Sequence, residues 1–448
     1  MHMSRGSRTA LLASCAALLL ATSACGDDQP EEAATQQVHL YGTDGNMSNS
    51  YPEELGDRAG LVNGMKGTTP LTPLPEDFKK RLLSVDPQLD GFLYAAEAYD
   101  AVVISALAAE VAGTTDPAAI AKQIVGITNG GTRCGTPAEC LPLARDGEDI
   151  EYRSVSITRA GFTDAGEPAT ASYATLHFDG DRLNDAKMEF VGAGDESAAS
   201  AKSPPKVDRS SNGGDAPLVL GGLLPKTGDL ALAYPPMAAG AALAIKELND
   251  AGGVLGKDVV WIDGDDGTNP TVAKATVARH LAEGVHVIIG AGGSGITAAV
   301  LDDVVKKGRI LFSPSNTAAS LTSAEDRGLY FRTAPPDSLQ GRALADVILR
   351  DGPHKIAIVA RKDSYGEGLQ DVVRSELERA GFGGDKVRLL SYEPGEGAEA
   401  PPIDFSDGAR QIKEFGADAV LIIGFSESAA VVRALADADV PLAALARR

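Results

Sequence analysis

The feature of this chain that most constrains its fold is a regular alternation of short apolar runs and amphipathic stretches from residue 217 onward. The runs are rich in Val, Ile and Leu, which is typical of strands buried on both faces of a sheet. In the stretch after the first run, Met237, Ala241, Ala244 and Leu248 recur at helical spacing. Strands that alternate with helices form a parallel sheet covered on both faces. The predicted strands begin at residues 217, 257, 285, 309, 355, 387 and 418.

A proline-containing segment divides these strands into two sets. Residues 331–337, FRTAPPD, interrupt the alternation. The chain has 448 residues, which is more than one ordinary domain needs. We therefore predict an α/β fold made of two doubly wound parallel-sheet lobes, with a crossing between the lobes at this segment.

The block 38–191 looks incomplete by itself. It begins with one short strand, VHLYG, and continues with helical patterns. It closes with alternating segments at 154–161 and 171–180, which predict a hairpin. Residues 192–216 are rich in Ser, Gly, Pro and charge, which predicts a flexible linker.

The N-terminus carries the pattern of an export signal. Arg5 and Arg8 precede an apolar stretch at 10–21, and small residues then lead to Cys25. The apolar stretch is too short for a membrane span, so we interpret 1–24 as a signal peptide. The small residues before Cys25 resemble a lipobox, which implies a lipid on Cys25, a polar tether over 25–37, and attachment to the outer face of the cell membrane. An ordinary signal with an incidental Cys is the alternative.

Composition argues against one class of partner, and the cysteines indicate a structural role. The chain has 62 Asp and Glu against 41 Lys and Arg, and a net charge of −21 argues against nucleic-acid binding. Cys134 and Cys140 form an even pair in an exported chain, which predicts a disulfide. No further metal ligands stand near them, so we predict no metal site.

Three motifs suggest enzymes or cofactors, and each lacks an essential part. Residues 290–295, GAGGSG, follow a strand, but no acid follows at the next strand end, so we predict no nicotinamide cofactor. Residues 424–428, GFSES, nearly match a nucleophile elbow without a suitable His. Residues 263–267, DGDDG, have the wrong spacing for a calcium loop. We predict that the chain is not an enzyme, with a nicotinamide-dependent enzyme as a remote alternative.

Longer motifs in both blocks resemble those of type I periplasmic binding proteins of the leucine/isoleucine/valine-binding class. Block 217–448 resembles the first part of that family, and block 38–191 resembles its last part. The motifs are LLPKTGDLA, IKELNDAGGVLGK, IIGAGGSG, FSPSNTA, YFRTAPPDSLQG and DSYGEG in the first, and YGTDGN, GMKGT and AAEAYDAV in the second.

The two blocks stand in reversed order, so the sequence looks like a circular permutant of that family. In a permutant, residues 441–448 should end beside the strand at Val38. The resemblance places crossings near 332–337, 48–66 and 128–153. Lobe one then combines 64–127 with 218–331, and lobe two combines 38–49, 154–191 and 333–441. A rearranged gene with a non-functional product is the alternative.

The resemblance also implies a ligand site at the carboxyl ends of the strands. It places the ligand's α-carboxylate against Ser294 and Gly295, with Asn316 and Thr317 beside it. Asp44 matches the acid that holds the α-ammonium, although many relatives carry Glu there. The remaining contacts implied are Tyr365, Phe425 and Thr227.

The implied function is a substrate-binding lipoprotein that delivers a small solute to an ABC permease. Branched-chain amino acids are the usual ligands of the family. A ligand-sensing domain of the same fold, without a transport role, is the alternative.

Overall fold

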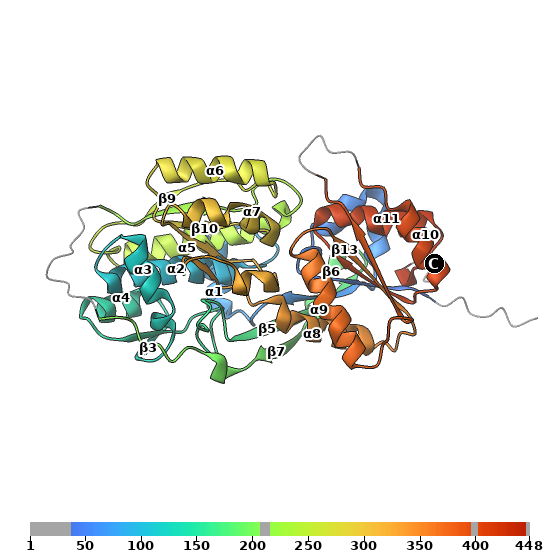
Figure 1. The fold of residues 1–448 in the computed structure, drawn as a ribbon, viewed down its shortest axis with the longest axis horizontal. Helices are drawn as coiled ribbons and strands as arrows, with labels where there is room; N and C mark the ends of the chain where they lie inside the picture. Colours follow the sequence, from blue (N-terminus) through green and yellow to red (C-terminus); the bar gives the residue numbers. More distant parts are fainter. Residues whose placement is uncertain (1–36, 207–215, 396–401, 445–448) are drawn as a thin grey trace, which may run out of the picture. The chain divides into compact units, whose positions relative to one another are not determined.

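The structure is a computed structural model, and it describes residues 37–206, 216–395 and 402–444 (Figure 1). The predicted signal peptide, almost all of the tether and Cys25 lie outside the described residues. Among the described helices, none is long and apolar enough to cross a membrane.

The first lobe is built on a five-stranded parallel sheet with the order β12-β11-β10-β8-β9. Helix α2 packs against the sheet and against α5, while α6 and α7 pack on each other and on the sheet. The strands are β8 (Val219–Leu223), β9 (Val260–Ile262), β10 (Val287–Gly290), β11 (Ile310–Ser313) and β12 (Tyr330–Arg332). The helices are α2 (Ala95–Ala112), α5 (Tyr234–Asp250), α6 (Pro270–Ala282) and α7 (Ser294–Val305).

Helix α2 is buried on all sides because other elements enclose it. It contacts α5, α3, α4 and the sheet, and nearly every one of its side chains is buried. A helix of this kind belongs in a core and shows little amphipathic pattern. Smaller elements complete this lobe: α1 (Glu76–Val85), α3 (Pro117–Ile124), α4 (Pro137–Arg145), β3 (Thr132–Cys134) and β4 (Ile150–Tyr152).

The second lobe is built on a mixed sheet with the order β14-β13-β15-β1-β2-β5-β6, and β7 also pairs with β5. Its central strands are buried on both faces: Ala357 and Val359 enter one apolar cluster, and Ile356 and Ile358 enter another. The strands are β1 (His39–Gly42), β2 (Lys66–Pro70), β5 (Thr170–Asp179), β6 (Arg182–Leu183), β7 (Glu189–Gly194), β13 (Ile356–Arg361), β14 (Val387–Tyr392) and β15 (Ala419–Ile423).

The helices of the second lobe are α8 (Asp337–Leu349), α9 (Gly366–Arg379), α10 (Ser406–Phe415) and α11 (Ala429–Asp437). Short 3-10 helices lie at Tyr51–Val62, Gly126–Thr128, Asp185–Lys187, Glu196–Ala198, Ala231–Ala233, Ala319–Ser323 and Ser426–Ser428.

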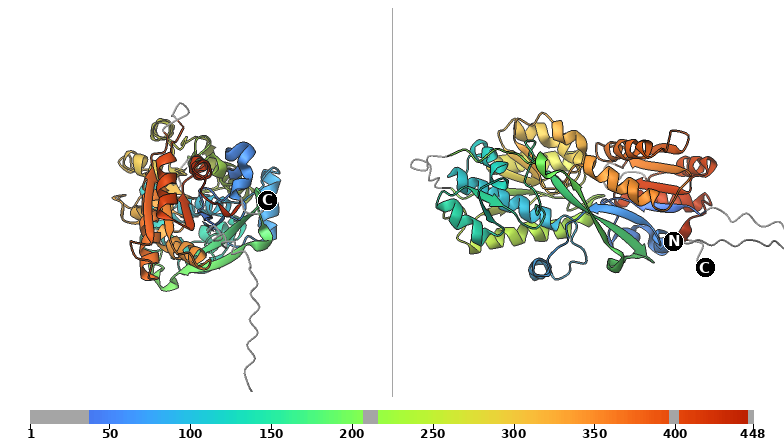
Figure 2. Two further views of the ribbon diagram at one scale, coloured as in Figure 1. Left: turned by 90° about the vertical axis from the view of Figure 1, so that its right-hand side faces the viewer. Right: turned by 90° about the horizontal axis from the view of Figure 1, so that it is seen from below.

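The predicted α/β class with parallel sheets is confirmed, with one difference in the second lobe. There β5 runs antiparallel to β2, β6 and β7, and Figure 2 shows β5 and β7 as the green strands. The predicted hairpin between 154–161 and 171–180 is wrong, because 154–161 forms no strand and β7 takes the place beside β5.

The lobe boundaries also differ from those predicted. Strand β2 pairs with β1 in the second sheet, so residues 66–70 belong to the second lobe, and the chain crosses after them. The core of the first lobe extends through Tyr152 to Phe162, so another crossing lies near 163–169 rather than 128–153. Residues 332–337 join β12 of the first sheet to α8.

Part of the predicted flexible linker is ordered. Its first residues complete β7, and Pro204 lies against Gly126, where an added Cβ would be 2.4 Å from the Pro204 nitrogen. The Gln123 side chain donates to the Pro205 carbonyl at 3.3 Å. Of the predicted linker, residues 207–215 lie outside the described residues.

The end of the described chain lies beside its start. Val38 donates to the Pro441 carbonyl at 2.8 Å, and Ala443 donates to the Val38 carbonyl at 2.9 Å. The next residues of the chain form β1, which pairs in parallel with β15. Residues 441–443 therefore lie beside the start of β1.

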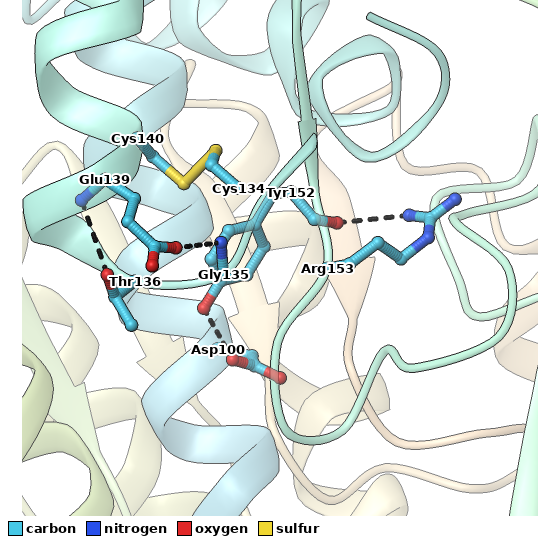
Figure 3. Close-up of a disulfide and its surroundings, with 8 residues drawn as sticks. All are labelled: Asp100, Cys134, Gly135, Thr136, Glu139, Cys140, Tyr152 and Arg153. Carbon is cyan, nitrogen blue, oxygen red and sulfur yellow. Dashed lines mark hydrogen bonds between the residues drawn. A yellow bond between two sulfur atoms is a disulfide. The ribbon is translucent and has the colours of Figure 1, made fainter. Parts of the chain in front are cut away.

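Cys134 and Cys140 form a disulfide at the edge of the first lobe (Figure 3). Their Cα atoms are 5.3 Å apart, within the range that a disulfide spans. Nearby, the Tyr152 hydroxyl donates to Asp100 at 2.7 Å, which ties β4 to α2.

Candidate functional site

The site lies where loops at the carboxyl ends of both sheets meet. From the first lobe come the loop and helix start at 291–295 and the loop at 314–318, which follow β10 and β11. From the second lobe come loops after β1, β13 and β15. Open α/β sheets bind ligands at this end of their strands.

The glycine-rich loop of the first lobe presents the N-terminus of α7. Helix α7 begins at Ser294, and no side chain caps it. The first N–H groups of a helix have no partner inside the helix, and the helix dipole makes them attractive to an anion. The Ser294 hydroxyl, which is buried, accepts from the backbone N–H groups of Thr317 and Ala318 at 3.2 Å each.

A buried carboxylate beneath this loop holds it in place. Asp266 is fully buried and accepts from the Gly292 N–H and the Thr268 N–H, both at 2.7 Å. Burial raises the pKa of Asp266 to about 7. Asp266 therefore braces the glycine-rich loop through Gly292.

Asn316 and Thr317 have different roles in the adjoining loop. The Asn316 amide donates to the carbonyls of Ala291 and Gly292 at 3.0 Å and accepts from the Tyr330 hydroxyl at 3.1 Å. These bonds use its amide on the protein itself, so Asn316 acts as a brace. Thr317 is buried and lies between Ser294 and the start of α8, because its carbonyl accepts from the Asp337 N–H at 2.7 Å.

Asp44 of the second lobe is buried, and the described side chains that bond its carboxylate are neutral. Its carboxylate accepts from the hydroxyls of Tyr94 at 2.9 Å and Tyr365 at 3.0 Å, and from the Gln340 amide at 3.2 Å. Burial raises the pKa of Asp44, although these hydrogen bonds act in the opposite direction. Tyr94 directly precedes α2 of the first lobe, so this bond crosses between the lobes.

A second acid lies close to Asp44. Asp337 begins α8, one helical turn before Gln340, and it is fully buried. Within the described residues, the Gln340 amide oxygen has no hydrogen-bond partner, and the Thr317 side chain lies beside the Asp337 carboxylate and lowers its pKa. Burial and then the nearby Asp44 carboxylate raise the pKa of Asp337 well above its usual range.

Aromatic side chains cover this acidic end of the site. The Tyr365 and Phe425 rings stack at a centroid distance of 5.4 Å and an interplanar angle of 16°. The Arg361 guanidinium lies 3.9 Å from the centre of the Phe425 ring. It is held by Glu427 and Asp363, each at 2.7 Å, so its charge is already paired.

Direct contacts join the two lobes around the site. A Cβ added to Gly295 would lie 3.3 Å from the Asp363 Cβ, and one added to Gly293 would lie 3.9 Å from the Phe425 ring. Ser426 donates to the Asp229 carbonyl at 3.1 Å across the lobes. The lobes therefore touch over the glycine-rich loop.

Most of the predicted contacts lie in this arrangement, and Thr227 stands apart. Ser294, Gly295 and Thr317 occupy the first-lobe side, and Asp44, Tyr365 and Phe425 occupy the second. Thr227 is exposed, and its hydroxyl donates to Asp265 at 2.6 Å. Within the described residues no hydrogen bond links it to the other predicted contacts.

Sequence reasoning missed Asp337, Gln340, Tyr94 and Asp266. Asp337 and Gln340 belong to the motif YFRTAPPDSLQG, which we interpreted as a family motif and a crossing without assigning these two residues to the site. Nothing in the local pattern distinguishes a buried acid at a helix start from an exposed one that caps it.

Comparison with known proteins identifies the family. The sequence profile of the periplasmic binding protein family matches residues 217–446, half of the chain. A Leu/Ile/Val-binding protein homolog of Brucella melitensis biotype 1 is 29% identical over 227 residues, which are 50% of this chain and 59% of that protein. The leucine-, isoleucine-, valine-, threonine- and alanine-binding protein of Pseudomonas aeruginosa is 32% identical over 202 residues, 45% and 52% of the two chains.

Solved structures include similar chains. A leucine-binding protein from Thermotoga maritima is 21% identical with a TM-score of 0.40, over 49% of this chain and 61% of that one. A branched-chain amino acid transporter substrate-binding protein from Streptococcus pneumoniae, in complex with isoleucine, is 24% identical with a TM-score of 0.39, over 46% and 57%. The chain spans less than two thirds of the length of these relatives in sequence order. From the family profile, the motifs and the α/β fold together, we conclude that the chain belongs to the periplasmic binding protein family.

Proposed function

We propose that this protein is an exported solute-binding protein that binds a small amino acid between its lobes and delivers it to an ABC permease. The observation that carries the proposal is a pair of opposite poles. The uncapped start of α7 at Ser294 attracts an anion, and the buried Asp44 has no cationic partner among the described residues that bond it. A zwitterion satisfies both poles.

The contacts available at this site can supply the free energy of micromolar binding. Charge-assisted hydrogen bonds contribute roughly 1.5–3 kcal/mol each. Three or four of them, with burial of the ligand side chain, approach the ~8 kcal/mol of micromolar binding. Because the ligand would contact both lobes, it favours their closed arrangement through its higher affinity for that state. A permease can recognise this closed state.

Export and anchoring extend the same proposal. The N-terminal pattern supports transfer across the membrane and a lipid on Cys25. Mass spectrometry of the protein purified from membranes, before and after Cys25→Ser, tests the anchor. A diacylglyceryl mass on the N-terminal fragment is expected, and its absence would leave an ordinary signal peptide.

Binding is tested with the full chain against a panel of amino acids, by thermal shift and then calorimetry. Asp44→Asn and Ser294→Ala should each weaken binding about 10-fold or more, since each removes a charge-assisted bond. Asp303→Asn, on the exposed side of α7, is the matched control and should bind as the wild type does. If no amino acid binds, the proposal is overturned.

We further infer that the chain is a circular permutant of the family order. The family profile matches only the block 217–446, and the pairing of Val38 with Pro441 and Ala443 supports a join at that point. A reordered chain that runs from 218 to 443, then directly from 38 to 206, should fold and bind the same ligand. If the reordered chain does not fold, whereas the natural order does, the inference is wrong.

A further inference from the structure

Resting on the lipid anchor of the proposed function, we propose that the amino-terminal edge of the second-lobe sheet is a membrane-facing surface that binds anionic phospholipid headgroups. We call this surface the basic edge. It is defined by Lys355, Lys386 and Arg388 together with the rings of Phe382 and Phe415. The ligand site stands at the opposite, carboxyl ends of the same strands, so the basic edge serves attachment and takes no part in solute binding.

The first support is that the three cations share one end of the sheet. Four parallel strands begin there in register, at Val387, Ile356, Ala419 and His39. Lys386 and Lys355 directly precede β14 and β13, and Arg388 is the second residue of β14. The backbone ties these starts together, because the Ile356 N–H donates to the Lys386 carbonyl at 2.8 Å and the Ala419 N–H donates to the Lys355 carbonyl at 3.3 Å.

Each of the three cations is exposed and lies over an aromatic ring. The charged groups of Lys355 and Arg388 lie 4.9 Å and 5.1 Å from the centre of the Phe415 ring, and the Lys386 ammonium lies 5.3 Å from the centre of the Phe382 ring. A ring holds a cation in place without neutralising it. Among the described residues, none of the three forms an ion pair with a carboxylate. Their charge is therefore available to a partner.

Acids also stand near this edge, and they do not cancel its charge. Asp418 is buried and accepts from two backbone N–H groups at 2.8 Å and 2.9 Å, and Glu414 lies 3.8 Å from Arg410. Exposed Asp385 and Asp439 then remain, which are two acids against the three cations. The whole chain carries a net charge of −21, so the basic edge is a local reversal of sign.

The second support is that the tether joins the described chain at this same edge. The His39 N–H donates to the Asp418 carbonyl at 2.9 Å, and β1 stands three strands from β14 in the order β14-β13-β15-β1. Neighbouring strands are about 4.8 Å apart, so the start of β1 lies roughly 14 Å from the start of β14. Residues 26–37 separate Cys25 from Val38, and a chain of that length reaches at most about 40 Å. A lipid on Cys25 therefore keeps the basic edge close to the bilayer.

Anionic lipid headgroups match the chemistry of this edge. Lys and Arg donate charge-assisted hydrogen bonds to phosphate oxygens. Lys and Arg beside Phe and Leu are typical of protein surfaces that lie at a bilayer interface, and Leu389, next to Arg388, is 37% exposed. A permease that recognises closure has to contact both lobes, whereas this edge belongs to one lobe. With the basic edge on the bilayer, the ligand site faces away from it and stays open to solutes.

The test measures hydrogen exchange of the protein while it is attached to vesicles. The protein purified from membranes is reconstituted into vesicles of phosphatidylcholine alone or of phosphatidylcholine mixed equally with phosphatidylglycerol. If Cys25 carries no lipid, its thiol is coupled to a maleimide lipid, so the attachment point is the same. The test variant combines Lys355→Glu, Lys386→Glu and Arg388→Glu. The matched control combines Lys122→Glu, Lys274→Glu and Lys307→Glu, which are exposed positions of the first lobe.

A Lys or Arg near an anionic bilayer favours association about five-fold, so three cations favour it roughly 100-fold. Backbone N–H groups of 382–392 and 410–418 should therefore exchange more slowly on the anionic vesicles than on the neutral ones. About 0.5 M salt should abolish this difference, because it screens the charges. The test variant should lose the difference as well, and the control should keep it.

Equal protection on both kinds of vesicle would overturn the proposal, because the acidic residues of the tether and not the lipid would then cover the edge. Protection that persists in the test variant, or that requires the permease, would overturn it too. If urea unfolding shows that the test variant does not fold, the salt dependence of the wild type decides. Amino acid binding is measured separately by calorimetry, so a failure of the proposed function and a failure of this inference are told apart.

Discussion

Replacing Glu97 with Gln should stabilise the protein, because this acid is buried without compensation. Glu97 lies in the first turn of α2 and is 3% exposed, and its Oε2 atom has no hydrogen-bond partner within the described residues. Burial, with a smaller contribution from Asp100, raises the pKa of Glu97 from 4.5 to about 8. The folded state therefore holds a proton that the unfolded state releases.

The sign and size of the effect of Glu97 on the free energy of unfolding follow from proton linkage. Between pH 4.5 and 8 the folded state binds more protons than the unfolded state, so stability falls as the pH rises through this window. One unit of pKa shift corresponds to about 1.4 kcal/mol, so Glu97 costs about 3 kcal/mol at pH 7. Gln has the same shape and no charge, so Glu97→Gln should recover most of this at pH 7 and nothing below pH 4.5.

Urea unfolding of the wild type and of Glu97→Gln from pH 4 to pH 8 measures the difference in their free energies of unfolding. Exposed Glu53→Gln serves as the control, and its effect should stay within about 0.5 kcal/mol at every pH. A difference between Glu97→Gln and the wild type that does not change with pH would refute the reasoning, because only a titrating group gives the expected slope.

Other consequences follow from the packing between and within the lobes. Arg332 is fully buried and binds Glu167, so Glu167→Gln should cost about 3–5 kcal/mol in urea unfolding, whereas a double change to apolar residues should cost less. Burial, with Glu427 nearby, raises the pKa of Asp229 to about 6 where the lobes meet, so protonation favours closure. Small-angle scattering should show the lobes closing as the pH falls from 7 to 5, and Asp229→Asn should remove that dependence. Replacing both Cys134 and Cys140 with Ser should lower stability by about 2 kcal/mol but leave ligand affinity unchanged, and a change in affinity would contradict this.

The sequence alone predicted those elements whose burial or turn follows from a few neighbouring residues. The strands at 287–290 and 356–360 are short apolar runs rich in Val and Ile, which is typical of strands buried on both faces of a sheet. The glycine-rich turn into α7 and the short spacing of Cys134 and Cys140 are equally local. Each was predicted because the information lies within a few neighbouring residues.

The tertiary structure alone decided which segments pair and where charge is left uncompensated. KGTTP is too polar to be recognised as a strand, yet it forms β2 because β1 and β5 flank it. Asp337 stands at a helix start, where an acid usually faces water, and it is buried only because α8 packs on β2. Pairing and burial depend on segments far apart in the chain, so a local pattern cannot report them. The same holds for Asp44 and Asp337: their proximity follows from how α8 meets β2 and the loop after β1.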